Sequence, residues 1–459
     1  MTERLAQFVV ETTYNDLPAE AIEQGKRALL DTIGVSLAGV RDDTGKIIVE
    51  TIAEIGGKPV AGVFGSSLKL DPASAALING TLGHALDYDD VNGSMRGHPS
   101  VPIAPAALAV GESVGASGQD ILLAFILGVE VECKVGRGIN IGSHYNAGWH
   151  ATATLGVLGA AAAAGKLLEL SDDQMVMALG IAASEASGLR QNFGTMTKPF
   201  HAGNAARGGV LAALLARNGF TADAAILEAK IGFGQIFSAG GQFDIERTVA
   251  SLGNPYDIVK PGISVKKYPC CFATHRALDA MAKIRREYEI QPSDVELIQV
   301  TVASGGLTPL IHSRPKTGLE GKFSMEYCLA AGLLDDQIRL ATFSDEAVAR
   351  PEAQALIPKV DVREDPDATA GPDGGFAEVK VRLTGGQEYD RRVDNPRGDP
   401  ADPLSWDELV DKYQDCAALI LDHPATDQSV RLLESLENLP DITQLMDIVC
   451  LTAPSHVQA

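Results

Sequence analysis

The chain contains 459 residues, with 38 Lys and Arg against 60 Asp and Glu, and its formal net charge is -22. This length predicts two or three domains and a core large enough to enclose a buried site. The acidity argues against a nucleic-acid polymer as partner, because phosphate binding depends on clustered Lys and Arg side chains. Six cysteines are too few for a disulfide scaffold, and their spacing does not suit an iron–sulfur cluster.

The first residues lack the basic-then-apolar layout of a signal peptide, and the most apolar stretches, such as 151–165, are shorter than a membrane span. We therefore expect a reduced, soluble protein of the cytoplasm that has no membrane partner.

The hydrophobic pattern of residues 1–265 predicts a mostly helical domain. Asp71 and Pro72 are typical of a helix start and predict a helix through 73–86. Ser171 to Gln174 forms a capping-box pattern ahead of a helix over 175–187, which Gly188 should end. An earlier segment carries apolar residues at helical spacing, namely Ile22, Leu29, Ile33 and Leu37.

One stretch of this domain, 151–165, consists mainly of small residues, with seven Ala and three Gly among its 15 positions. Side chains of this size let neighbouring helices approach closely. The composition therefore predicts a central, buried helix.

The pattern changes near residue 266. Residues 276–288 have helical spacing, 295–302 are rich in β-branched side chains, and 376–393 alternate as in a hairpin with a Gly385-Gly386 turn. Prolines at 396, 400 and 403 precede a helical segment that starts at Trp406. We predict a mainly α fold: a large helical domain over 1–265, a smaller inserted α+β lid domain over 266–400, and C-terminal helices over 401–459 that return to the helical domain.

Candidate chemistry is concentrated in a few stretches. The stretch from His84 to Ser100 holds several acids together with Arg96 and His98, and it should form a loop between packed elements. Its composition suits a loop that orients a histidine while holding an anion, although a solvated acidic turn is an equally simple interpretation. His150 should lie in the first turn of the small-residue helix, where helix N–H groups favour anions and a neutral imidazole. The alternative is that His150 only caps that helix and has no role in a site.

Three further stretches supply polar groups. The glycine-rich segment 192–208 carries Lys198 and His201, but it lacks the order of a phosphate-binding loop, so it is either a site or a charged connection. The segment 266–275 carries Lys267 and His275 at the junction of the predicted domains, where ligand sites often lie. Tyr327 should be helical, and a Tyr at such spacing is more often part of the core than catalytic.

Metal binding and nucleophilic catalysis both have weak support. A plausible set of metal ligands would form if four residues converged, namely Asp87, His98, His150 and His275. None of them shows the short sequence spacing that identifies a metal site. No G-x-S-x-G elbow is present. We therefore favour an acid–base site without a metal or another cofactor.

At these residues the sequence resembles the MmgE/PrpD family, which includes 2-methylcitrate dehydratase, cis-aconitate decarboxylase and iminodisuccinate epimerase. The resemblance covers nearly the whole chain. Its motifs, in order, are His84-Ala-Leu-Asp-Tyr-Asp-Asp with Gly97-His-Pro-Ser, then Gly148-Trp-His, Gly194-Thr-Met-Thr-Lys-Pro, and Tyr268-Pro through Thr274-His275.

The resemblance implies a large helical domain with an α+β lid, a homodimer, and a site between the domains that needs no metal. Matched position by position, it implies the catalytic residues Asp87, His98, His150, Lys198, His275 and Tyr327. We expect Arg96, Lys198, His201 and Lys267 to bind the substrate carboxylates, since cations must hold them and stabilise developing charge.

All the implied activities act on the carbon next to a carboxylate, and an imidazole is a suitable base for this step. We rank first a hydro-lyase that dehydrates a 2-hydroxy di- or tricarboxylate of the methylcitrate or citrate type. The alternatives are an epimerase of a dicarboxylate, a cis-aconitate-type decarboxylase, and a non-catalytic carboxylate-binding protein. Val91 counts against the decarboxylase, because that branch prefers a polar side chain near this position.

Overall fold

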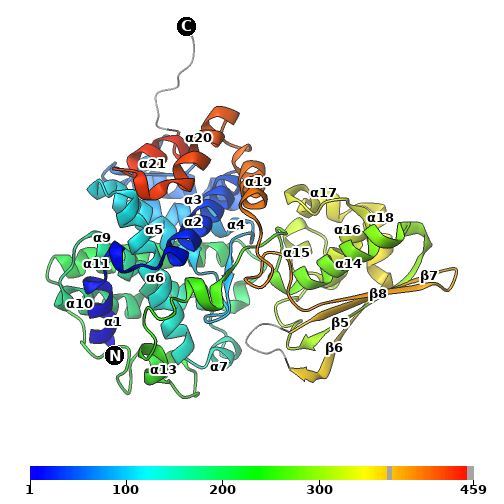
Figure 1. The fold of residues 1–459 in the computed structure, drawn as a ribbon, viewed down its shortest axis with the longest axis horizontal. Helices are drawn as coiled ribbons and strands as arrows, with labels where there is room; N and C mark the ends of the chain where they lie inside the picture. Colours follow the sequence, from blue (N-terminus) through cyan, green and yellow to red (C-terminus); the bar gives the residue numbers. More distant parts are fainter. Residues whose placement is uncertain (370–374, 452–459) are drawn as a thin grey trace, which may run out of the picture. The chain divides into compact units, whose positions relative to one another are not determined.

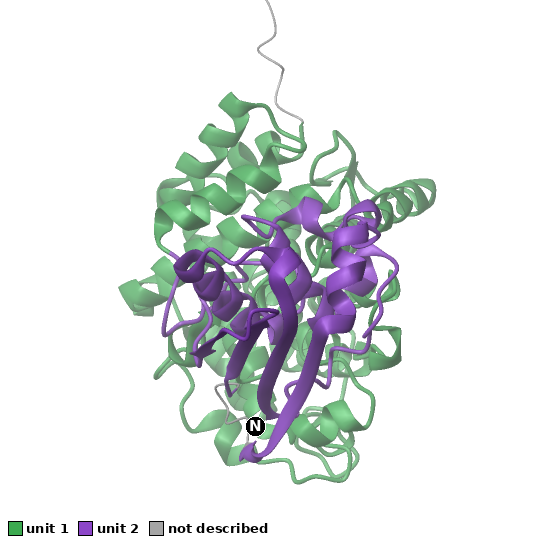
Figure 2. Ribbon diagram, turned by 90° about the vertical axis from the view of Figure 1, so that its right-hand side faces the viewer, with its two compact units in different colours: residues 1–263, 405–459 green, residues 264–404 purple. Residues whose placement is uncertain are grey.

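The computed structural model describes residues 1–369 and 375–451, and the chain forms two compact units (Figure 2). Unit 1 comprises Met1–Ile263 together with the chain from Ser405 onward, and unit 2 comprises Ser264–Leu404. Helices dominate the described residues (Figure 1), which confirms the prediction of a mainly α fold.

Unit 1 is built almost entirely from helices. Its first part contains α1 (Thr2–Glu11), α2 (Ala19–Gly39), α3 (Asp43–Ile55), α4 (Pro72–Ala85), α5 (Ser100–Val114), α6 (Gly118–Gly138), α7 (Ile141–Asn146), α8 (Ala151–Thr154), α9 (Gly156–Leu167), α10 (Asp172–Glu185), α11 (Thr197–Arg217), α12 (Phe233–Phe237) and α13 (Ile245–Val249). Three short strands accompany them, β1 (Ala61–Gly62), β2 (Lys69–Leu70) and β3 (Val91–Asn92), and β1 pairs with β2.

The predicted helix starts are confirmed. The Asp71 side chain accepts hydrogen bonds from the first turn of α4, and Ser171 and Gln174 make the reciprocal bonds of a capping box on α10. Helix α10 ends at Glu185, somewhat before Gly188. The early helical pattern corresponds to α2.

The small-residue stretch is helical and buried as predicted, but it is not one continuous helix. The helix is interrupted at Leu155, which separates α8 from α9. In α8 the threonine side chains serve neighbouring segments: the Thr152 hydroxyl accepts a hydrogen bond from the His98 N–H, and the Thr154 hydroxyl bonds to His144. This short helix therefore connects several parts of unit 1.

Close helix packing places the site residues of unit 1. Helix α11 lies against α4 and α9, and α9 lies against α5 and α6. Gly203 of α11 is in such close contact with α4 that an added Cβ would lie 2.2 Å from the Leu77 carbonyl oxygen. Because only glycine fits there, α11 can bring its first turn beside the end of α4.

The last helices of the chain belong to unit 1. They are α19 (Trp406–Ala417), α20 (His423–Glu434) and α21 (Thr443–Val449). Helix α19 packs against α2. Its buried face includes Leu409, Lys412 and Tyr413.

Unit 2 combines helices with a sheet. Its elements are α14 (His275–Tyr288), α15 (Gly318–Gly321), α16 (Met325–Leu334), α17 (Asp345–Val348), α18 (Pro351–Leu356), β5 (Val295–Ser304), β6 (Val360–Thr369), β7 (Ala377–Leu383) and β8 (Glu388–Val393), and β4 (Ile263–Ser264) lies at its start. The strand order is β6-β5-β7-β8, in which β5 and β6 are parallel and the other pairs are antiparallel. The predicted strand and hairpin are thereby confirmed.

Alternation along the strands builds the core of unit 2. Val300 of β5 is opposite Val379 of β7 and Val362 of β6, and side chains two positions away share its face. Helices α14 and α16 contribute apolar side chains to the same core, including Met281, Ile284 and Leu329. Figure 1 shows both helices on one face of the sheet.

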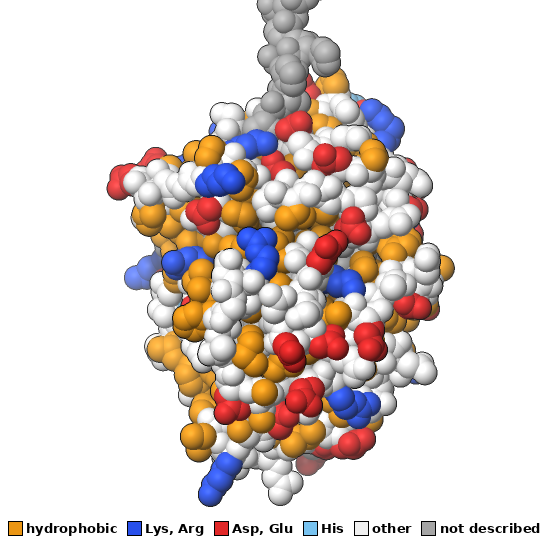
Figure 3. Space-filling model, turned by 90° about the vertical axis from the view of Figure 1, so that its left-hand side faces the viewer, with side chains coloured by type: hydrophobic (Ala, Val, Ile, Leu, Met, Phe, Trp, Pro, Cys, Tyr) orange, Lys and Arg blue, Asp and Glu red, His pale blue; other side chains and the backbone are white. Residues whose placement is uncertain are grey.

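The surface carries both charge signs. On the face drawn in Figure 3, Lys and Arg side chains are scattered among acidic and apolar ones. Among the described residues, no helix combines the length and the hydropathy that a membrane crossing requires.

Candidate active site

The loop between α4 and α5 supplies the acidic groups of the site. Near its start lies Asp87, whose backbone is left-handed with φ of 52°, a conformation that residues with side chains adopt only occasionally. It ends where Asp90 contacts Ser100, the first residue of α5, through both the backbone N–H and the hydroxyl. Asp89 lies between these two anchors and is fully buried.

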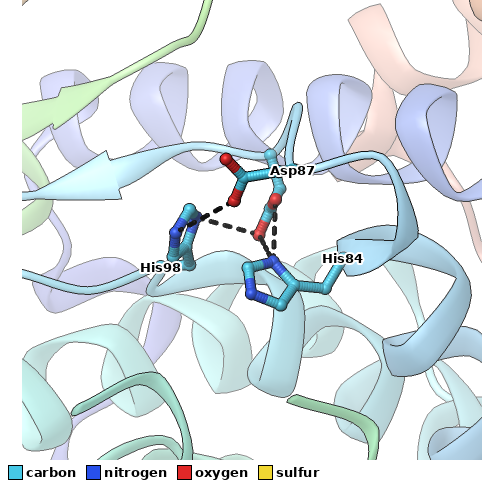
Figure 4. A group of neighbouring side chains, drawn as sticks. His84, Asp87 and His98 are labelled. Carbon is cyan, nitrogen blue, oxygen red and sulfur yellow. Dashed lines mark hydrogen bonds and ion pairs between the residues drawn. The ribbon is translucent and has the colours of Figure 1, made fainter. Parts of the chain in front are cut away.

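Asp89 binds two imidazoles. Its carboxylate lies 2.8 Å from the Nδ1 atom of His84 and 3.1 Å from the Nδ1 atom of His98. Burial by itself raises the pKa of Asp89, but the two histidines outweigh it and hold this pKa well below its usual range. Asp89 is therefore a carboxylate that accepts the Nδ1–H of His84 and forms an ion-pair contact with the His98 ring. Figure 4 shows the side chains of His84, Asp87 and His98 pointing toward one another.

Lys198 meets this group from the first turn of α11. Its Nζ atom lies 2.5 Å from Asp87 Oδ1 and 2.9 Å from His84 Nε2. It also lies 5.4 Å from the centre of the Phe193 ring. The side chains of Lys198 and Asp87 are almost completely buried, so the ion pair is shielded from water.

The protonation state of His84 follows from its two contacts. Burial lowers the pKa of His84 to about 3, and Lys198 and His98 act in the same direction, although Asp89 opposes them. The imidazole is therefore neutral at pH 7. Its Nδ1–H donates to Asp89, and its Nε2 accepts a hydrogen bond from the Lys198 ammonium.

His150 and His201 form a second histidine pair beside the first. Their Nδ1 atoms are 3.1 Å apart, and the His150 ring centre is 5.9 Å from that of His84. Burial lowers the pKa of His201 to about 4 with help from Lys198, and burial holds the pKa of His150 well below its usual range. Both rings are neutral at pH 7, so one Nδ1 donates and the other accepts.

A divalent cation would find oxygen and nitrogen donors in this group. His84, Asp87, Asp89 and His98 each offer a ligand atom, and these atoms lie within 4.8 Å of one another. The Lys198 ammonium already bonds to two of these residues. A metal ion could use all four ligand atoms only if the Lys198 ammonium moved away. The present arrangement therefore suits the Lys198 ammonium better than a metal ion.

The structure brings five of the predicted site residues together in unit 1. They are Asp87, His98, His150, Lys198 and His201. The side chain of His98 is the more accessible of the two predicted proton-transfer imidazoles, at 12% exposed, while His150 is 1% exposed. Arg96 is exposed, and its backbone carbonyl accepts a hydrogen bond from the Tyr145 hydroxyl.

The other predicted site residues belong to unit 2. Tyr327 is fully buried, and its hydroxyl donates to the Thr342 carbonyl within the core of that unit. His275 is also buried, with its Nε2 atom 3.3 Å from the Cys270 carbonyl. Lys267 is partly exposed and lies 3.5 Å from Asp279. The predicted roles of His275, Lys267 and Tyr327 stay predictions.

Sequence reasoning did not select His84 and Asp89, although they organise the cluster. Their signal is present in the segment from His84 to Asp90, where a histidine in the last turn of a helix precedes three acids. The structure shows that the histidine turns toward the second of these acids, Asp89, and not toward Asp87.

Comparison with known proteins gives the family. Residues 3–246 match the MmgE/PrpD N-terminal domain, and residues 268–438 match the MmgE/PrpD C-terminal domain. The chain belongs to the MmgE/PrpD family.

Its similar relatives include two enzyme types. The chain is 30% identical to a cis-aconitate decarboxylase of Aspergillus terreus, over 98% of this chain and 96% of that protein. It is 29% identical to the cis-aconitate decarboxylase of Homo sapiens, over 100% of this chain and 96% of that protein. It is 25% identical to a probable 2-methylcitrate dehydratase of Saccharomyces cerevisiae, over 80% of this chain and 74% of that protein.

Proposed function

We propose that this protein is a lyase that acts on a di- or tricarboxylate by proton transfer at the carbon next to a carboxylate, without a metal or another cofactor. The observation that carries the proposal is the buried group of neutral imidazoles around one ammonium. Lys198 supplies a fixed positive charge for a substrate carboxylate and for the negative charge that develops on it. Arg96 and Lys267 are the proposed additional carboxylate ligands.

His98 is the proposed proton-transfer group. Asp89 holds its Nδ1 atom, so the Nε2 atom is the one that would exchange a proton with substrate. Asp87 lies 3.8 Å from that Nε2 atom and can steady the ring once it becomes positively charged. The His150–His201 pair can accept or return a proton beside it, because both rings are neutral at rest.

The first candidate reaction is dehydration of a 2-hydroxy di- or tricarboxylate. It starts with proton removal, which a neutral imidazole can carry out, and burial keeps His150 and His201 neutral. The proton leaves the carbon next to a carboxylate, the electron pair forms the new double bond, and the hydroxyl departs with a second proton as water. Tyr327 and His275 are the proposed donors of that second proton.

The second candidate is decarboxylation of a cis-aconitate-type substrate. It is favoured by the relatives that match almost the whole chain, since these are named cis-aconitate decarboxylases. In that reaction carbon dioxide leaves, and the carbon next to a remaining carboxylate receives a proton. The same cation and the same imidazole would serve both reactions.

The test is a substrate screen on chelator-treated protein, read by proton NMR in deuterated buffer. Citrate-type hydroxyacids should yield a conjugated alkene if the protein is a dehydratase, and cis-aconitate should lose carbon dioxide if it is a decarboxylase. Deuterium in recovered substrate without either product would indicate an epimerase.

The matched variants are His98→Gln in the cluster and His423→Gln on the surface, where the side chain is 87% exposed. The first should lower turnover by about 10²–10⁴-fold and the second should not change it. Activity that is lost on chelation and restored by a metal would contradict the proposal. So would a protein that anions stabilise but that converts none of these compounds.

A further inference from the structure

The turn that carries Asp87 and Asp89 contacts helix α19, near the end of the described chain. Lys412, on the buried face of α19, points its Nζ atom at the Tyr88 carbonyl oxygen, 2.9 Å away. The same Nζ lies 3.8 Å from the centre of the Tyr88 ring and 2.6 Å from Asp31 Oδ1 of α2. The two charged side chains are 6% and 0% exposed, so water does not weaken the contact.

The Tyr88 carbonyl lies, along the chain, between the two acids of the site. Tyr88 stands between Asp87, which binds Lys198, and Asp89, which binds two imidazoles. The carbonyl belongs to the peptide group that joins Tyr88 to Asp89, so an ammonium bound to it fixes the direction in which Asp89 leaves the turn. Such a restraint supports the left-handed backbone of Asp87, a conformation that residues with side chains adopt only occasionally.

We propose that Lys412 is a positioning residue of the active site, which fixes the Asp87–Asp89 turn so that Asp87 meets Lys198 and Asp89 meets His84 and His98. Asp31 keeps the ammonium in place. The kinetic part of this inference rests on the proposed function, whereas the geometric part does not.

The competing explanation is that Lys412 has only a structural role, since the removal of one partner of any buried ion pair destabilises a protein. Asp31 on α2 and Cys416 on α19 interact with the ammonium, and Asp90 in the loop and Arg27 on α2 interact in turn with Asp31. Lys412→Met alone removes the ion pair of the buried Asp31. The double variant Lys412→Met with Asp31→Asn removes both charges, so it separates loss of stability from loss of position.

The experiment compares the full chain with three variants: Lys412→Met, the double variant, and Lys166→Met as a control. Lys166 also donates to two backbone carbonyls, those of Val10 and Thr12, but at another place in unit 1. Thermal unfolding gives the stability of each protein. The imidazole N–H resonances of ¹⁵N-histidine-labelled protein report the His84 and His98 bonds to Asp89, and His98→Gln assigns them.

We expect the single variant to unfold at a lower temperature and the double variant to recover most of this loss. The double variant should still show displaced imidazole N–H resonances, with kcat reduced by about 10–100-fold and KM changed much less. Lys166→Met should lose stability but keep the resonances and kcat. A double variant with native resonances and native kcat would overturn the proposal.

Two outcomes remain to be separated. If the protein converts no carboxylate, displaced resonances in the double variant still support the positioning role, while the proposed function fails. If the double variant does not fold, Lys412→Arg takes its place, because it keeps the charge beside Asp31 but cannot put its donor at the same point. It should displace the resonances, and native resonances in a folded Lys412→Arg protein would overturn the proposal.

Discussion

Asp89→Asn tests the arrangement of the site most sharply, because one carboxylate holds two imidazoles. An amide of the same shape can accept an N–H from one ring, but it presents its own NH₂ group to the other. If that ring is His84, its proton must move to Nε2, where it would face the Lys198 ammonium 2.9 Å away. The variant therefore keeps the packing and removes the electrostatic order of the cluster.

The expected loss follows from the two contacts. A contact of an imidazole with a charged carboxylate contributes about 1.5–3 kcal/mol, so the His84 hydrogen bond and the His98 ion pair together contribute about 3–6 kcal/mol. Since each factor of ten in rate corresponds to about 1.4 kcal/mol, kcat should fall by about 10²–10⁴-fold. The change should exceed the change in KM, because Asp89 orients the reacting groups and does not contact the substrate carboxylate in the proposed mechanism.

The matched control is Asp90→Asn at the next position. Burial raises the pKa of Asp90 to about 8, and Asp31 acts in the same direction, so this carboxyl is largely neutral at pH 7. Asparagine can replace its contacts with Ser100 without loss of charge. Steady-state kinetics at pH 7 should show a near-native kcat for Asp90→Asn and a strongly reduced kcat for Asp89→Asn. Equal activities for the two variants would refute the reasoning.

Three further predictions concern stability. Since the pKa of Asp90 is raised in the folded state to about 8, the stability that this carboxyl contributes is complete below pH 4 and is lost as pH rises through 8. Asp90→Asn should therefore gain stability relative to the native protein between pH 5 and 8 in thermal melts, by about 6 kcal/mol at most, and a constant difference would contradict this. Lys198→Met should cost about 3–5 kcal/mol in denaturant unfolding, because Asp87 loses the ammonium of its buried ion pair, and adding Asp87→Asn should recover stability without activity. Gly203→Ala should cost about 1–3 kcal/mol, because its Cβ would meet the backbone of α4, whereas Gly142→Ala, whose Cβ would have ordinary contacts, should cost nothing; equal melting temperatures would count against the packing argument.

Local signals predicted the elements of the fold well. The Asp71 cap, the Ser171 capping box and the Gly385-Gly386 hairpin depend on residues only a few positions apart, and all are present in the structure. The interruption at Leu155 was not predicted. It occurs where threonines of α8 bind side chains and backbone from other segments, and these tertiary contacts leave no trace in a run of small residues.

The candidate site could be predicted by residue type but not by partner. The imidazoles and Lys198 were selected through the family resemblance, and carboxylate chemistry, which needs cations and a base, agrees with that choice. His84 and Asp89 lie at the centre of the site because the end of α4 meets the first turn of α11. The close contact of Gly203 with α4 determines how these two helices meet. Lys412 was not foreseen for the same reason, since it is 324 positions away from the carbonyl that it binds.

The most direct test of the central claim follows a solvent deuteron. When cis-aconitate is incubated in deuterium oxide, both hydration, the reverse of dehydration, and decarboxylation place a deuteron on a carbon next to a carboxylate, and mass spectrometry detects it. The account predicts a deuterium-labelled product with the native protein and a rate lower by about 10²-fold or more with His98→Gln. Product formed without deuterium at that carbon, or at the native rate by His98→Gln, would contradict it.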